Sequence, residues 1–257
     1  MPFSYKEYGK IISYLTTGVD LPVTDYSSID EASSRFLILR HDVEYSPERA
    51  LKLAEFECRN LNVRSSYFFQ TRNNTYNLLS DVNLAIVKKI SKMGHRIGLH
   101  VHTGTWTGAN LDKFVEDEIL LMESASGLSI DRFSYHRPKS SMLSKPLRIE
   151  GKINAYDPLY FHFFESNLPK TPPVTYISDS NHRWKFGHPL DLKQGISRVH
   201  LLTHPFSWTK SGHKNTENFA SLILEMKEEM IESINREIKT FPKELLITRI
   251  GDSHGQA

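Results

Sequence analysis

Short β-rich segments alternate with helical patterns along this chain, and this rhythm limits the possible folds more than any other feature. The β-rich segments cover residues 36–39, 66–69, 97–100, 133–135, 174–177, 199–202 and 245–248. The first four are about thirty residues apart, which is the length of one strand-plus-helix unit. Apolar strands that alternate with helices indicate a parallel sheet covered on both faces. Six or seven such units favour a closed or nearly closed α/β barrel, ahead of an open doubly wound sheet.

Helix signals lie between these segments. Ser46 followed by Pro47 is typical of an N-cap and a first helical residue. Gly94 and Gly127 are placed to end two further helices, over residues 81–93 and 110–126. A long helical pattern covers residues 215–239. We therefore expect strand and helix to follow one another over most of the chain.

Composition narrows the class of protein. The 257 residues include 32 Lys and Arg against 30 Asp and Glu, and this near balance argues against a nucleic-acid partner. Cys58 is the only cysteine, so a disulfide framework is excluded. No apolar run approaches the ~20 residues of a membrane span, and residues 1–15 show no secretory pattern. We expect a cytoplasmic protein with a single domain over residues 1–257 and leave its oligomeric state open.

Polar side chains follow almost every β-rich segment. These groups are Arg40-His41-Asp42-Val43-Glu44, His100-Val101-His102, His136-Arg137-Pro138, Ser178-Asp179-Ser180 and Thr203-His204-Pro205. In parallel α/β folds, functional groups gather at the carboxyl ends of the strands. We therefore expect these groups to meet on one rim of the sheet.

The residue types on this rim predict metal-assisted hydrolysis. Residues two apart on an extended segment face the same way, as Asp42 and Glu44 do, and likewise His100 and His102. A carboxylate with imidazoles suits zinc and similar divalent ions, and an open coordination position holds a water that the metal acidifies. A second carboxylate can take the proton of that water, and a separate histidine can protonate the leaving group. Arg137 could keep that carboxylate ionised and oriented.

Each residue also has a structural interpretation. Most single histidines at strand ends are satisfied polar residues, and Asp42 with Glu44 could instead cap the helix after Ser46. Arg137-Pro138 could simply end a strand, and Cys58 on an apolar helix face is typical of a buried thiol. The number of chemically capable groups expected on one rim favours the functional interpretation.

Five motifs, in this order, resemble the polysaccharide deacetylase superfamily of carbohydrate esterases. They are Ile38–Glu44, Ser66–Phe69, Gly94–His100, His136–Pro138 and Leu202–Pro205, and the resemblance runs from about Phe36 to Trp208. More narrowly, the chain is similar to deacetylase-like proteins of surface-polysaccharide biosynthesis, such as that of O-antigen and lipopolysaccharide. The resemblance implies a distorted (β/α)7 barrel.

The resemblance also implies catalytic roles. Asp42 matches the general base, Arg137 the arginine that orients this base, and His204 the general acid. Asp179 and Trp184 match the segment that supports the catalytic histidine and lines the groove.

The implied metal site departs from the family pattern. Glu44 matches a metal ligand that is usually Asp, and His100 matches the first histidine ligand. The second histidine normally follows four residues later, where this chain has Gly104. His102 is the expected replacement, with His41, His136 or a water as alternatives.

Two functions follow from these expectations. The first is a metal-dependent hydrolase, with zinc as the expected ion, that removes an N-acyl group such as acetyl from a cytoplasmic amino-sugar or glycan precursor. The alternative is a non-hydrolytic relative that binds a sugar or performs other acyl or amide chemistry in glycan maturation, and Gly104 in place of histidine motivates it.

Overall fold

The structure is a computed structural model that describes residues 3–105, 110–162, 173–240 and 242. It divides into two compact units, Met1–His213 and Lys214–Ala257. The second unit contains helix α6 (Asn215–Glu237), which begins with the Glu217 carboxylate accepting a hydrogen bond from the backbone N–H of Lys214 at 3.1 Å. All other elements below belong to the first unit.

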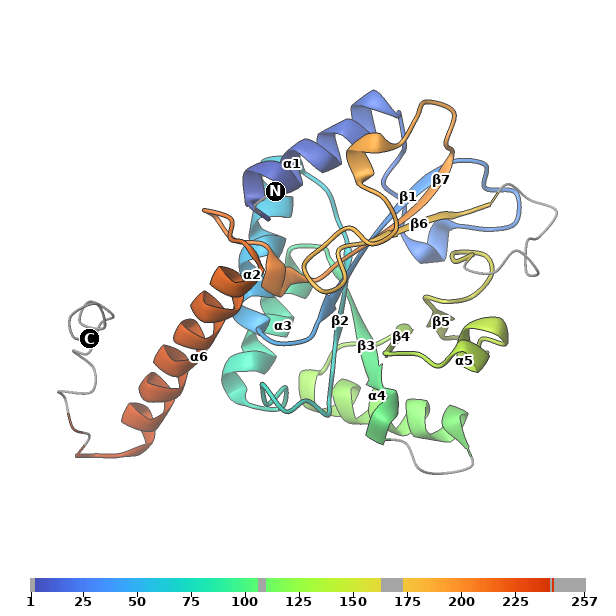
Figure 1. Ribbon diagram of the computed structural model, residues 1–257. Coiled ribbons are helices and arrows are strands. Elements are labelled where there is room, and N and C mark those ends of the chain that lie inside the picture. The colour runs from blue at the N-terminus through green and yellow to red at the C-terminus, as the bar shows by residue number, and fades with distance from the viewer. Residues whose placement is uncertain (1–2, 106–109, 163–172, 241, 243–257) are drawn as a thin grey trace. The chain divides into compact units, whose positions relative to one another are not determined.

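A sheet of seven strands forms the centre of the first unit (Figure 1). The strands are β1 (Phe36–Val43), β2 (Ser66–Phe69), β3 (Arg96–His102), β4 (Arg132–His136), β5 (Ile153–Asn154), β6 (Thr175–Ser178) and β7 (Arg198–Thr203). Their order is β5-β4-β3-β2-β1-β7-β6, and every pairing is parallel. This arrangement confirms the expected α/β class and the distorted (β/α)7 barrel. Among the described residues no ladder joins β5 to β6, so the barrel is open there.

The expected strands and the observed strands agree except at two places. Six of the expected segments lie in β1, β2, β3, β4, β6 and β7. The expected segment 245–248 lies outside the described residues. Strand β5 was not expected, because its two residues are too short to show a strand period.

The helices begin and end where local chemistry favours it. They are α1 (Tyr5–Ser13), α2 (Pro47–Phe56), α3 (Asp81–Lys92), α4 (Leu111–Ser126) and α5 (Ser140–Ser144). Ser46 caps α2, since its Oγ accepts a hydrogen bond from the backbone N–H of Arg49 at 3.1 Å. Gly127 ends α4 in the left-handed region with φ of 69°, which glycine adopts without a steric penalty. None of the described helices is both long and apolar enough to cross a membrane.

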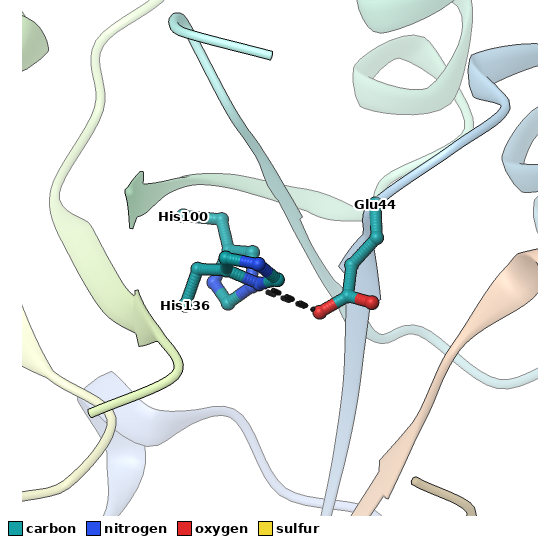
Figure 2. Close-up of side chains that lie close together, drawn as sticks. All are labelled: Glu44, His100 and His136. Atoms are coloured by element: carbon teal, nitrogen blue, oxygen red, sulfur yellow. Dashed lines mark hydrogen bonds and ion pairs between the residues drawn. The ribbon is translucent and has the colours of Figure 1, made fainter. Parts of the chain in front are cut away.

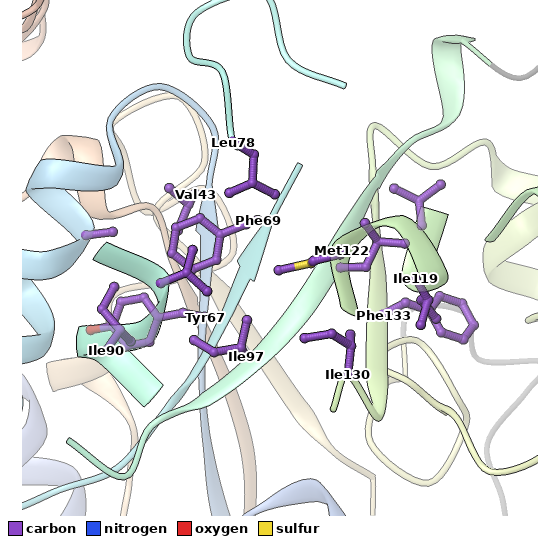
Figure 3. Close-up of a cluster of buried hydrophobic side chains, with 14 of the residues drawn as sticks. Val43, Tyr67, Phe69, Leu78, Ile90, Ile97, Ile119, Met122, Ile130 and Phe133 are labelled. Atoms are coloured by element: carbon purple, nitrogen blue, oxygen red, sulfur yellow. The ribbon is translucent and has the colours of Figure 1, made fainter. Parts of the chain in front are cut away.

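The largest apolar cluster lies between the sheet and helices α2, α3 and α4 (Figure 3). Among its buried members are Val43, Tyr67, Phe69, Ile90, Ile97, Ile119, Met122 and Phe133. On the other face, the side chains of Phe68 and Arg132 fill the space over Gly98, so that a Cβ added there would come within 2.5 Å of the Phe68 ring. This packing fixes β1, β3 and β4, the strands from which the candidate site is built.

Candidate active site

Three potential metal ligands meet at the carboxyl ends of β1, β3 and β4 (Figure 2). One ligand atom from each of Glu44, His100 and His136 lies within 4.8 Å of the other two. Glu44 Oε1 is 2.8 Å from His136 Nδ1 and 3.7 Å from His100 Nε2. The structure therefore brings together the expected Glu44 and His100, with His136 as the third group.

His100 carries the observation that tests whether a metal fits here. Its Nδ1 lies 2.8 Å from Ser134 Oγ, while its buried Nε2 has no hydrogen-bond partner. That Nε2 is 3.6 Å from Asp42 Oδ2 and 3.7 Å from Glu44 Oε1. A buried imidazole nitrogen that faces carboxylates without a bond is costly unless a cation or a proton lies between them. The donor set of one carboxylate and two imidazoles fits a divalent ion such as zinc.

His102, expected as the third ligand, lies outside this group. Residues two apart on a strand are about 6.6 Å apart along it, so His102 lies further towards the end of β3 than His100. It pairs in register with His136, and the two rings are 5.0 Å apart between centroids. Within the described chain, the three-residue ligand group contains His136 and omits His102.

His41, another alternative for this site, faces elsewhere. Its Nδ1 is 2.7 Å from Thr203 Oγ1 and its Nε2 is 3.0 Å from Glu57 Oε1. Successive residues of a strand point to opposite sides, so His41 cannot share the side of Asp42. The histidine belongs to a buried hydrogen-bond network behind β1.

Asp42 is held in place by an arginine of its own strand. Arg40 Nε donates to Asp42 Oδ1 at 2.9 Å, and Arg40 Nη2 donates to Asp42 Oδ2 at 2.8 Å. Burial alone would raise the pKa of Asp42, but the charges of Arg40 and His100 outweigh it and lower that pKa below its usual value. Asp42 is therefore an ionised carboxylate next to the three potential ligands.

Arg137, expected to orient Asp42, lies elsewhere. Its side chain is exposed, and its backbone has a φ of 50°, so the chain leaves the strand direction directly after His136. The guanidinium that binds the Asp42 carboxylate in the structure is that of Arg40. The reason is the strand period, which places residues 40 and 42 side by side.

His204 is hydrogen-bonded to the buried carboxylate of Asp179 through the ring nitrogen that does not face Glu44. Its Nδ1 lies 2.6 Å from Asp179 Oδ1, and its Nε2 is 3.8 Å from Glu44 Oε1. Trp208 Nε1 donates to Asp179 Oδ2 at 2.8 Å and fixes that carboxylate. Burial would lower the pKa of His204, but the charges of Asp179 and Glu44 reverse this and raise it to about 9.

Opposite ionisation states follow for the two groups. Asp42 is a carboxylate that can accept a proton, and His204 is an imidazolium that can donate one from Nε2. Pairs of groups whose surroundings separate their pKa values in this way are typical of an acid and a base in one site. Trp184, expected to line the groove, packs against the apolar cluster that contains Phe3, with 5.9 Å between the two ring centroids.

Two residues of the site were not assigned to it from the sequence. Arg40 was quoted in the first motif, but no role was derived for it, although its spacing from Asp42 is the same as that of Asp42 from Glu44. The aromatic-rich segment 156–164 is expected from the sequence to line a substrate groove or to form part of the core or a lid, with no contact to Asp42 or Arg40; in the structure the Tyr156 hydroxyl accepts a hydrogen bond from Arg40 Nη2 at 3.1 Å. No local pattern connects Tyr156 to β1, since the contact spans more than a hundred residues of chain.

Comparisons with known proteins gave structural neighbours only. No family model matches the chain, and no curated protein matches it. The chain is similar to the CE4 domain of a multidomain xylanase from the hindgut metagenome of Trinervitermes trinervoides, with 12% identity, a TM-score of 0.39, and coverage of 83% of this chain and 90% of that one.

Of two further neighbours, one is described as a deacetylase and the other as a pseudoenzyme. A chitin deacetylase from Colletotrichum lindemuthianum has 14% identity, a TM-score of 0.42, and coverage of 76% of this chain and 84% of that one. A CE4 family pseudoenzyme from Bacillus anthracis has 14% identity, a TM-score of 0.40, and coverage of 81% and 68%. Likeness at this distance says nothing about activity, which has to be argued from the site. Two of these three neighbours are CE4 proteins, and the third is a chitin deacetylase.

Proposed function

We propose that the protein is a metal-dependent carbohydrate deacetylase that removes an N-acyl group, acetyl in the first place, from an amino-sugar precursor of a surface polysaccharide. One observation carries the proposal: Glu44, His100 and His136 offer three ligand atoms within 4.8 Å of one another, beside an ionised carboxylate and a protonated imidazole. Zinc is the proposed ion, because two imidazoles and one carboxylate form a common catalytic zinc site.

The ligand group and the two flanking residues divide the work of amide hydrolysis. A divalent ion bound by Glu44, His100 and His136 would supply Lewis acidity to a water and to the amide oxygen. The Asp42 carboxylate accepts the proton of the attacking water, and Arg40 keeps this carboxylate ionised and aimed.

The leaving amine needs a proton from the other side of the site. His204 can supply it from Nε2, because its Nδ1 is committed to Asp179 at 2.6 Å. The negative charge of Asp179 stabilises the imidazolium before transfer and fixes the ring orientation. The same arrangement is suited to acyl groups other than acetyl, since the residues act on the amide and not on the acyl chain.

The test combines metal content with turnover. Purified protein incubated with Zn²⁺ and dialysed should retain near-stoichiometric metal and release acetate from UDP-N-acetylglucosamine or N,N′-diacetylchitobiose. Asp42→Asn should keep the metal but lose about 100-fold or more in kcat, the usual scale for removing a general base. Asp112→Asn, an exposed carboxylate in the first turn of α4, is the matched control and should change neither quantity.

Two outcomes would contradict the proposal. Full turnover by Asp42→Asn would show that the base is another residue. Stoichiometric metal without acetate release from either compound would favour the non-hydrolytic alternative.

A further inference from the structure

An open cavity of about 650 Å³, with polar residue types in its lining, lies at the same end of the sheet as the potential metal ligands. Its lining is the segment after β2 and the last residue of β3, namely Thr71, Arg72, Asn73, Asn74, Thr75, Tyr76, Asn77 and His102. The cavity therefore opens at the same rim as the ligand group. His102 connects the two, since its ring is 5.0 Å from that of His136.

The wall of this cavity is tied to the main chain of a potential ligand. Asn73 Nδ2 donates to the carbonyl oxygen of Glu44 at 2.9 Å, and Thr75 Oγ1 donates to the same oxygen at 3.1 Å. The hydroxyl of Tyr76 donates to the carbonyl oxygen of Val43 at 2.9 Å. These three hydrogen bonds hold the segment 71–77 against the end of β1 and so position the cavity next to the site.

The positive charge of Arg72, in the lining of the cavity, is neutralised by a carboxylate of helix α4. Arg72 Nε donates to Glu118 Oε1 at 2.7 Å, and Thr71 Oγ1 contacts the other oxygen of this carboxylate. Glu118 is buried in α4, so its charge stays next to Arg72. Since the hydroxyls of Thr71, Thr75 and Tyr76 already donate hydrogen bonds, the lining offers a ligand the amide of Asn74 and the imidazole of His102 rather than a net positive charge. Such a surface suits hydroxyl and amide groups, whereas a phosphate would require unpaired Arg or Lys.

Asn74 is the lining residue best placed to contact a ligand. Its side chain is exposed in the cavity and takes part in none of the hydrogen bonds that hold the described segment 71–77 in place. Asn73 and Asn77, by contrast, use their side chains to brace the backbone, at Thr75 and Leu79 respectively. A cavity of this size is within the range of about 300–1,000 Å³ that is usual for small-ligand sites.

We propose that this cavity is a subsite for an uncharged sugar unit linked to the unit that is deacetylated, and that Asn74 and His102 contact it. The inference rests on the proposed function, because it takes the deacetylated unit to lie at the metal ligands. It gives His102 the role of a substrate contact in place of the role of a metal ligand. It also predicts that an amino sugar linked to a second sugar unit is a better substrate than a single amino sugar.

The first test compares a disaccharide with a monosaccharide. Asn74→Ala should raise KM for N,N′-diacetylchitobiose by about 2- to 10-fold, the factor that corresponds to one hydrogen bond, with kcat unchanged. KM for N-acetylglucosamine should not change, since the single sugar does not reach the subsite. Asn235→Ala, an exposed asparagine of α6, is the matched control and should behave as the wild type.

His102→Gln provides the second variant. It should raise KM for the disaccharide in the same way while leaving the zinc content unchanged. Loss of zinc from this variant would return His102 to the metal site and overturn its role as a substrate contact. A melting temperature equal to that of the wild type shows that neither variant acts through misfolding.

Binding without turnover separates this inference from the proposed function. The affinity for N,N′-diacetylchitobiose is measured by titration calorimetry on two proteins, the Asp42→Asn variant and the Asp42→Asn/Asn74→Ala double variant. If the disaccharide binds and the double variant binds it more weakly, the subsite holds even if the wild type shows no hydrolysis. If the wild type hydrolyses the disaccharide and Asn74→Ala leaves KM unchanged, the subsite is wrong although the function stands. No binding to either protein, or tighter binding of N-acetylglucosamine 1-phosphate than of the disaccharide, overturns the uncharged-sugar subsite.

Discussion

Individual side chains in this site take their chemical roles from their nearest partners. Asp42 is kept ionised by two hydrogen bonds from Arg40, and His204 is kept protonated mainly by Asp179. His100 is directed by Ser134 at one nitrogen, so that the other nitrogen faces the carboxylates of Asp42 and Glu44. A metal ligand oriented from behind in this way binds more tightly than one that is free to rotate.

The identity of the third ligand can be tested at this scale. His136→Ala should lower zinc affinity by about 100-fold or more, since loss of a direct ligand costs at least as much as loss of an outer-shell partner. His102→Ala should retain the metal, because His102 lies outside the ligand group. Zinc titration of the two apo variants measures both affinities. Retained zinc in His136→Ala together with lost zinc in His102→Ala would restore the ligand set expected from the sequence.

At the scale of an element, strand β1 separates two kinds of chemistry by its twofold period. Arg40 and Asp42 point to one side and form the ion pair beside the site. His41 points to the other side and joins Thr203 and Glu57 in a buried network. One strand of eight residues therefore supplies both the face that carries the candidate site and a face that belongs to a buried hydrogen-bond network.

The Arg40 and Asp42 pair gives a prediction for β1. Arg40→Lys keeps a positive charge but cannot form the two parallel hydrogen bonds, so the pKa of Asp42 should rise. Because the base must be deprotonated, the acidic limb of the pH–rate profile should move to higher pH, so that kcat at pH 4 falls by a larger factor than kcat at pH 7. The profile of kcat against pH measures the shift. Arg137→Lys is the comparison: a larger shift there than in Arg40→Lys would place the orienting arginine where the resemblance implies.

At the scale of the whole molecule, several ionisable side chains of the described residues lie in the interior. Arg40, Arg132 and His200 are fully buried, although all three lie on strands of the central sheet. His200 receives a hydrogen bond from Tyr26, with the Tyr26 hydroxyl 2.9 Å from Nε2, and its Nδ1 donates to the carbonyl oxygen of Tyr160 at 3.0 Å. Burial together with the charge of Arg40 lowers the pKa of His200 to about 3, which keeps the ring neutral and leaves Nε2 able to accept the hydrogen bond from Tyr26.

This neutral histidine makes the folded protein sensitive to acid. In the unfolded chain the His200 pKa returns to 6.5, so below this pH the unfolded state binds a proton that the folded state does not. The contribution of His200 to stability is complete above pH 6.5 and falls by about 1.4 kcal/mol per pH unit as the pH drops towards 3. His204 has a raised pKa of about 9, so its contribution is lost only at higher pH and does not cancel the effect.

The measurement is the free energy of unfolding between pH 7 and pH 4 for the wild type and for His200→Gln. Glutamine offers a donor and an acceptor but does not titrate, so the variant should lose less stability on acidification. Equal slopes for the two proteins would contradict a neutral buried His200.

The sequence by itself determined the parallel α/β class, most strands, the caps of α2 and α4, and the rim on which Asp42, Glu44, His100 and His204 meet. These features depend on periods and on residues close in the chain, which the sequence displays directly. Only the tertiary structure decided that His136 joins Glu44 and His100, that the cavity of segment 71–77 adjoins them, and that Glu57 is a buried carboxylate. Glu57 accepts hydrogen bonds from Tyr8, Ser65 and Tyr67, which come from separate parts of the chain. Ligand sets, cavities and pKa values depend on which residues are neighbours in space. A linear sequence does not contain the distances between residues that are far apart in the chain.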